Sequence, residues 1–74
     1  MMNELLKQVE EIFSDAYIYL DKWHKESIIF GEKQFRVSKY HDEYEFRKAG
    51  YTLCVSKDAS KIIAVIKAIK ECEE

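Results

Sequence analysis

The stretch from Ser27 to Ser56 most constrains the fold, because apolar and polar residues alternate along it. In three short runs every second side chain is apolar, and the residues between are mostly polar. The apolar positions are Phe35, Val37, Tyr44, Phe46, Tyr51, Leu53 and Val55. Successive side chains of a strand point to opposite faces, so this pattern predicts an antiparallel sheet with one apolar and one polar face.

The turn residues divide this stretch into short strands. The expected strands are 27–30, 34–40, 44–48 and 51–55. Gly31 can adopt positive φ in the first turn, and Ala49 with Gly50 suits the two-residue loop of the last hairpin.

The hairpin loop predicts a register for the last two strands. It places Phe46 opposite Leu53 and Tyr44 opposite Val55, so that both pairs lie on the apolar face. In the same register Cys54 lies on the polar face, away from any covering helix.

Two amphipathic helices are expected, one on each side of the strands. Apolar residues at three- and four-residue steps predict a first helix over Asn3–Lys22, with the asparagine as N-cap. A break near Ser14 is the alternative, because Tyr17–Leu20 has strand propensity. The second helix is expected to begin near Asp58, a good N-cap, although Ser56 could compete for that role.

This order of elements predicts a two-layer α+β fold with a single domain over residues 1–74. An antiparallel meander of three to four strands carries the N- and C-terminal helices on one face (α-β-β-β(-β)-α). The predicted core is Leu5, Val9, Ile12, Phe13, Phe35, Val37, Phe46, Leu53, Val55, Ile62, Ile66 and Ile69.

Composition restricts the classes of function and location. Fourteen acidic and 12 basic residues give a net charge of −2, which provides no general attraction to nucleic acid. No apolar run approaches the roughly 20 residues that span a bilayer, and the start lacks a secretory-signal pattern. We therefore expect a cytoplasmic protein without membrane association. Cys54 and Cys72 are expected to be free thiols, with Cys72 on the apolar stripe of the second helix.

No catalytic or metal-binding motif is recognisable. His24 and His41 lack the spacing of metal ligands. Cys54 has no motif that supplies a base, and two glycines are too few to build a phosphate-binding loop. The expectation is a protein that is not an enzyme and uses no cofactor or metal.

The polar face of the sheet is the candidate interaction surface. Arg36, Tyr40 and Arg47 lie on it, and Trp23 and Ile18 are also expected to be exposed. Arg, Tyr and Trp are enriched at binding hot spots. A protein partner or a second copy of the chain is therefore expected at this face.

The same register that pairs Val37 with Phe46 brings Arg36 opposite Arg47. Like charges across a strand pair destabilise the sheet unless another group neutralises them. Two explanations remain open. Glu43 or Glu45 could provide the carboxylate internally, or a partner protein could provide it by bidentate pairing.

In size and charge the chain is similar to accessory or phage-borne regulators that block a larger protein, anti-CRISPR inhibitors among them. The similarity implies a small protein-interaction module that acts as a regulator or inhibitor.

A nucleic-acid-binding domain is the alternative. The stretch from Ser56 to Lys61 opens the second helix with Lys57, Ala59 and Lys61. With its element order, this resembles the double-stranded-RNA-binding domain, and the resemblance implies that Lys57 and Lys61 contact phosphates. Asp58 departs from the basic pattern of that family, which weakens the expected phosphate contact.

Overall fold

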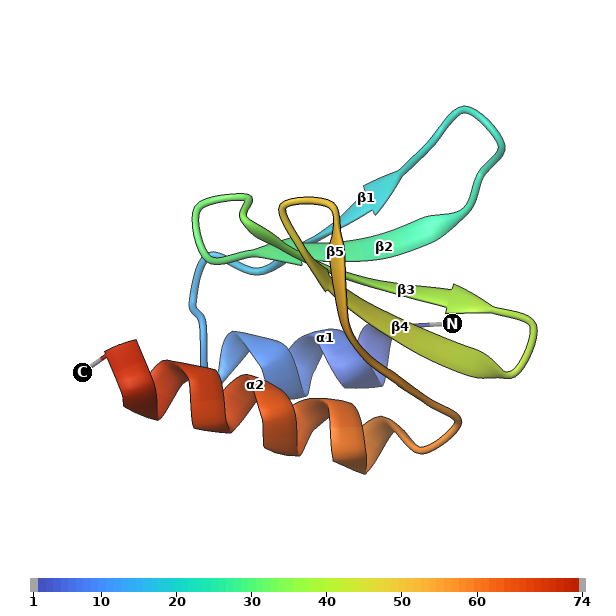
Figure 1. The fold of residues 1–74 in the computed structure, drawn as a ribbon. Helices are drawn as coiled ribbons and strands as arrows, with labels where there is room; N and C mark the ends of the chain where they lie inside the picture. Colours follow the sequence, from blue (N-terminus) through green and yellow to red (C-terminus); the bar gives the residue numbers. More distant parts are fainter. Residues whose placement is uncertain (1, 74) are drawn as a thin grey trace.

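Five antiparallel strands form one sheet, and two helices cover one of its faces (Figure 1). The computed structural model describes residues 2–73. The elements are α1 (Asn3–Glu10), β1 (Tyr17–Leu20), β2 (Glu26–Phe30), β3 (Phe35–Tyr40), β4 (Glu43–Lys48), β5 (Tyr51–Ser56) and α2 (Ala59–Glu73). The predicted two-layer α+β fold, with both helices on one face, is confirmed.

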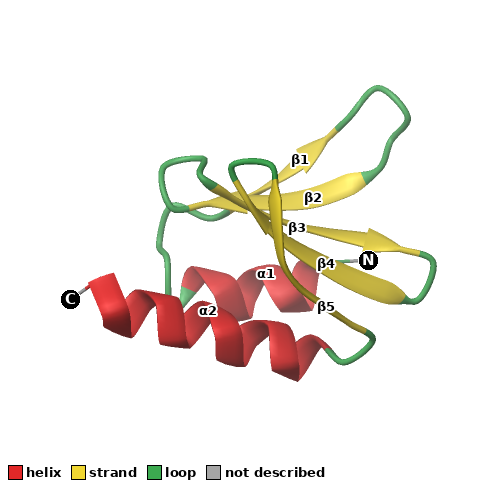
Figure 2. Ribbon diagram, in the orientation of Figure 1, coloured by secondary structure: helices red, strands yellow, loops and turns green. Residues whose placement is uncertain are grey.

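The sheet is a simple meander in which each strand pairs with the next one along the chain, in the order β1-β2-β3-β4-β5. The two helices lie side by side beneath it and run in the same direction (Figure 2). The loop between β1 and β2 projects away from the helices (Figure 1). One face of the sheet is therefore covered, and the other is free of helices.

The expected long first helix is wrong, and the alternative of an early break is correct. α1 ends at Glu10, and Tyr17–Leu20 forms β1 instead of a last helical turn. Its residues pair with β2, which places Ile18 directly opposite Ile28. The aromatic and β-branched residues of this segment gain cross-strand partners that a helix would not provide. The sheet gains its fifth strand in this way.

The core is an aromatic cluster closed by aliphatic residues of both helices. The Phe30 ring stacks on Phe35 at 5.3 Å and on Phe46 at 5.9 Å between centroids, and Phe13 lies 5.1 Å from Phe30. The predicted core residues that are buried are Leu5, Val9, Phe13, Phe35, Val37, Phe46, Ile62 and Ile66. Ile12 and Ile69, also predicted in the core, are half-buried and pack against it.

A β-bulge overturns the predicted register of the last hairpin. The two-residue loop is correct, and Arg47 lies opposite Thr52, but the register then shifts so that Phe46 faces Cys54. Leu53 is the extra residue of β5. A shift by one residue exchanges the two faces of a strand, because side chains alternate with period 2.

The consequences of this bulge correct several predictions. Leu53 and Val55, predicted in the core, are 43% and 51% exposed. Cys54, predicted to point away from the helices, is half-buried and packs against the core. Tyr44 lies opposite Ser56 and not opposite Val55.

The two cysteines are free, as predicted. Their environments are the reverse of the prediction, because Cys54 is half-buried and Cys72 is exposed. Cys72 lies near the C-terminal end of α2, where the helix continues past the core.

Only one of the predicted N-caps is confirmed. Asp58 caps α2, since its Oδ1 accepts a hydrogen bond from the Ser60 backbone N–H at 2.9 Å. The Ser60 hydroxyl and the Ser60 backbone N–H both donate hydrogen bonds to the Asp58 carboxylate, and these bonds lower the pKa of Asp58. Met2, and not Asn3, occupies the N-cap position of α1, where no side chain caps the helix.

Candidate functional site

The sheet face opposite the helices, here called the outer face, is organised in rows of side chains that cross the strands. One row runs through Tyr17, Ile29, Arg36, Arg47 and Thr52. The next runs through Tyr19, Ser27, Ser38, Glu45 and Val55. Because every second residue of a strand shares a face, each row alternates with one that points into the core.

The predicted pairing of Arg36 with Arg47 is confirmed. Arg47 is half-buried, and its Nη2 donates a hydrogen bond of 2.8 Å to the carbonyl oxygen of Gly50. Its Nε is buried and has no hydrogen-bond partner within residues 2–73. A buried donor without a partner costs free energy, so this guanidinium is only partly satisfied in the isolated protein.

Arg36 is exposed, and its guanidinium lies over the ring of Tyr19, 5.7 Å from the centroid. This cation–π contact orients the side chain across β2 toward β1 without neutralising its charge. The cross-strand neighbour Arg47 carries the same charge, so the pair forms a local positive centre on an acidic protein.

Internal neutralisation of these arginines is not observed. Within the described part of the chain the one ion pair joins Lys57 to Asp42 and involves neither arginine. The carboxylate of Glu45 accepts a hydrogen bond of 2.8 Å from Thr52 Oγ1 instead. The hypothesis that Glu43 or Glu45 pairs with the two arginines is therefore wrong.

A groove of about 490 Å³ lies on the outer face around the two arginines. We call it the basic groove, and it is lined by Tyr17, Tyr19, Ile29, Lys33, Gln34, Arg36, Arg47, Ala49 and Gly50. Three of these residues are cationic and none is acidic. The groove thus combines positive charge with aromatic side chains.

Of the nine residues that line the basic groove, the sequence predicts only Arg36 and Arg47 as site residues. The expected long helix includes Tyr17 and Tyr19, and Lys33 falls in the turn after the first expected strand. The strand propensity of Tyr17–Leu20 was the signal that would have placed both tyrosines on the sheet.

Tyr40 lies on the outer face but at a distance from the basic groove. It pairs with Glu43 at the last position of the β3–β4 ladder and is 46% exposed. The ammonium group of Lys25 lies 5.4 Å from its ring centroid. The predicted trio of Arg36, Tyr40 and Arg47 is therefore on one face, with the tyrosine separated from the arginine pair.

Trp23 and Ile18 are not neighbours on one surface. Trp23 is 69% exposed in the loop between β1 and β2, with the Lys22 ammonium 4.5 Å from its ring centroid. Ile18 is half-buried and packs against the core opposite Ile28. The expected exposure of Ile18 is wrong, because the alternation of β1 turns this residue toward the helices.

Asp21 orders the loop that carries Trp23. Its Oδ1 accepts hydrogen bonds from the backbone N–H of Lys25 at 2.9 Å and of Trp23 at 2.8 Å. The hydrogen bonds that Asp21 accepts lower its pKa, and the bond from the Lys25 N–H has the largest effect. Trp23 therefore lies in a turn whose backbone is held by the Asp21 carboxylate.

The two histidines line a second surface cavity of about 470 Å³, together with Glu26 and Tyr40 among others. Within residues 2–73 no group of three or more His, Cys, Asp or Glu side chains is placed to hold a metal ion.

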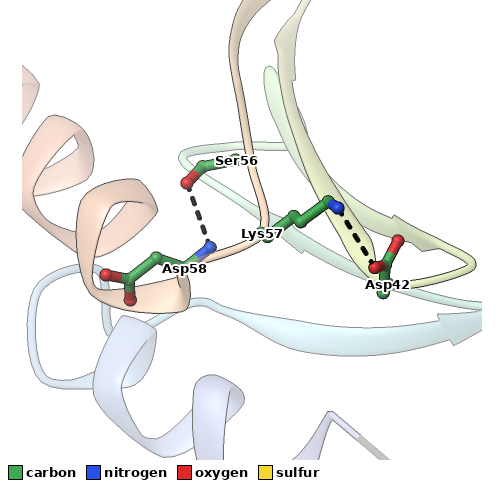
Figure 3. A network of polar contacts seen from close by, with 4 residues as sticks. All are labelled: Asp42, Ser56, Lys57 and Asp58. Atoms are coloured by element: carbon green, nitrogen blue, oxygen red, sulfur yellow. Dashed lines mark hydrogen bonds and ion pairs between the residues drawn. The ribbon is translucent and has the colours of Figure 1, made fainter.

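The lysines of the alternative nucleic-acid site lie at the start of α2. Lys57 Nζ is 3.5 Å from Asp42 Oδ2, and both side chains are exposed (Figure 3). Asp58 caps the helix next to them, and Lys61 is exposed in the first turn. The two carboxylates offset the positive charge that phosphate binding would require.

Comparison of the chain with family models, with curated proteins and with solved structures finds no match. Within residues 2–73 no helix is both long enough and apolar enough to cross a membrane.

Proposed function

We propose that this protein is a non-enzymatic, cytoplasmic interaction module that regulates or inhibits a larger partner protein by binding it with the outer face. The observation that carries the proposal is the arginine pair. Arg36 and Arg47 lie opposite one another without an ion pair in the described chain, and the Nε of Arg47 is buried without a partner.

Such an arrangement is unfavourable for the isolated sheet. Like charges directly across a strand pair destabilise it, and an unsatisfied buried donor adds to the cost. The buried Nε is enclosed by the protein, whereas a partner carboxylate over the arginine pair can neutralise the two like charges. Partner binding therefore removes the electrostatic cost of the Arg36–Arg47 pair.

The surroundings of the arginine pair also support a protein interface. Exposed aromatic residues, among them Tyr19, Tyr40 and Trp23, occupy the outer face and the loop beside it. Tyrosine, tryptophan and arginine contribute most to binding free energy at protein interfaces. The helices occupy the other face, which leaves the outer face as the broad surface for a partner.

The test is capture of partners from a lysate of the native host, with wild type and variants compared. The combination Arg36→Ala, Tyr40→Ala and Arg47→Ala should weaken binding about tenfold or more, since truncated hot-spot residues cost 1–2 kcal/mol or more. The matched control is Lys57→Ala with Lys61→Ala, on α2, which should bind like wild type. Circular dichroism verifies that both variants fold.

Two results would overturn this proposal. One is unchanged affinity in the folded triple variant. The other is binding to duplex RNA that weakens steeply with salt and is lost in the Lys57 and Lys61 control, which would establish the nucleic-acid alternative. Light scattering of the purified protein distinguishes a second copy of the chain from a different partner.

A further inference from the structure

We infer that the basic groove binds an acidic segment of the partner protein, with a side-chain carboxylate held by Arg47 and Arg36. This inference rests on the proposed function and specifies the chemistry of the partner at that site.

The charge of the groove is the first argument. Its cations are Lys33, Arg36 and Arg47, and no carboxylate lines it. On a protein with a net charge of −2, this local excess of positive charge is not a general property of the surface. It attracts an anionic group to one position of the outer face.

The unused donors of Arg47 are the second argument. Its Nη2 donates a hydrogen bond to the carbonyl oxygen of Gly50, and its Nε is buried and has no partner within residues 2–73. A guanidinium has five N–H donors in a planar fork that matches the two oxygens of a carboxylate. Because the Nε is enclosed by the protein, a bound carboxylate pairs with the terminal N–H groups of Arg47 at the groove and neutralises the guanidinium charge.

The walls of the groove are the third argument. Ile29, between Tyr17 and Arg36 in the same cross-strand row, is only 6% exposed. Tyr19 packs under the Arg36 guanidinium and limits the positions that this group can adopt. The apolar floor and the two tyrosines give the apolar part of a peptide a surface to pack against beside the arginines.

The surroundings of the groove favour an acidic peptide over a nucleic acid. A polynucleotide needs several successive phosphate contacts to bind well. The next row of the outer face carries Glu45, and Glu43 follows beside Tyr40. These carboxylates would repel a chain of phosphates, whereas a peptide can place its acidic residue in the groove and neutral residues beyond it.

The inference is tested by nuclear magnetic resonance titration with two capped peptides, acetyl-Gly-(Glu)₄-Gly-amide and its (Gln)₄ counterpart. The readout is the Nε–H resonance of each arginine, assigned with Arg36→Lys and Arg47→Lys. The glutamate peptide should shift the Arg47 and Arg36 resonances in a saturable manner. The glutamine peptide should bind about tenfold more weakly or worse, because it lacks the charge-assisted hydrogen bonds.

Substitutions inside and outside the basic groove test whether the peptide binds there. Arg36→Gln and Lys33→Gln change exposed side chains and should leave the fold intact while weakening the glutamate peptide severalfold. Lys57→Gln, which lies outside the groove, should bind the peptide like wild type. Affinity for the glutamate peptide should also fall as salt is raised.

Three outcomes would overturn the inference. These are the absence of any arginine shift at millimolar glutamate peptide, equal binding of both peptides, and stronger binding of an oligothymidylate probe, which would assign the groove to nucleic acid. If the peptide fails while the triple variant still loses its captured partner, the carboxylate inference fails and the proposed function stands. Unchanged capture by the triple variant overturns the proposed function itself.

Discussion

Asp15 and Gly31 are joined by a hydrogen bond in which Asp15 Oδ1 accepts from the Gly31 N–H at 3.0 Å. The second oxygen accepts from the Glu32 N–H at 2.7 Å. The turn held in this way has positive φ at three successive residues, Gly31, Glu32 and Lys33. Left-handed backbone is unfavourable for the two non-glycine residues, so the carboxylate stabilises a strained turn that also places Lys33 at the basic groove.

The first prediction concerns pH. The hydrogen bonds from Glu32 and Gly31 lower the pKa of Asp15 from its ordinary value of 3.8. A carboxyl group with a lowered pKa in the folded state stabilises the protein above the ordinary value, and this contribution is lost as pH falls through the folded-state pKa. Asp15→Asn should therefore be less stable than wild type at neutral pH, and the difference should shrink below about pH 4.

Urea unfolding of wild type and Asp15→Asn at several pH values between 7 and 3 provides the measurement. Asp21 and Asp58 also have lowered pKa values and remain in both proteins, so the difference isolates Asp15. A difference in unfolding free energy that is the same at every pH would show that the carboxylate charge is not responsible.

The second prediction compares the two glycines. Both have positive φ, but a Cβ at Gly31 would overlap the ring of Phe35, whereas a Cβ at Gly50 would meet open space. Gly31→Ala and Gly50→Ala both place a side chain at positive φ, and only the first adds overpacking of about 1–3 kcal/mol. Thermal unfolding should show the lower midpoint for Gly31→Ala. Equal midpoints would mean that the Phe35 ring moves aside at no cost.

The third prediction concerns the centre of the core. Phe46 is fully buried, and its ring lies 5.9 Å from Phe30 and 5.7 Å from Phe35. Phe46→Ala should cost about 3–5 kcal/mol, a large part of the stability of so small a domain. Phe46→Leu keeps most of the volume and should remain folded with a lower midpoint. A melting temperature that barely changes in Phe46→Ala would show that Phe46 does not lie on the sheet face that the helices cover.

The fourth prediction concerns the two thiols. Cys72 is exposed and Cys54 is half-buried against the core. A thiol reagent added to the folded protein should modify Cys72 quickly and Cys54 slowly, whereas unfolded, unreduced protein should give two equivalents at once. Cys72→Ser should remove only the fast phase. A fast phase that survives this substitution would place Cys54 at the surface.

The alternation over Phe35–Phe46 and the periodicity of α2 were sufficient to predict much of the fold. These patterns predicted the α+β class, the helices on one face, the β3–β4 register and the Arg36–Arg47 pair, which are all observed. The physical reason is that hydrophobic periodicity is a local property, and a strand or helix must turn its apolar side to the core wherever that core lies.

Tertiary structure decided the features that depend on a distant neighbour. Tyr17–Leu20 is a strand because β2 is there to pair with it, although its residues also fit a helical stripe. The bulge at Leu53 reverses the faces of Cys54 and Val55. The sequence does not reveal it, because the alternation of Tyr51, Leu53 and Val55 continues without interruption. The basic groove exists only because strands β1, β3 and β4 bring Tyr17, Tyr19, Arg36 and Arg47 to one face, a proximity that no local pattern encodes.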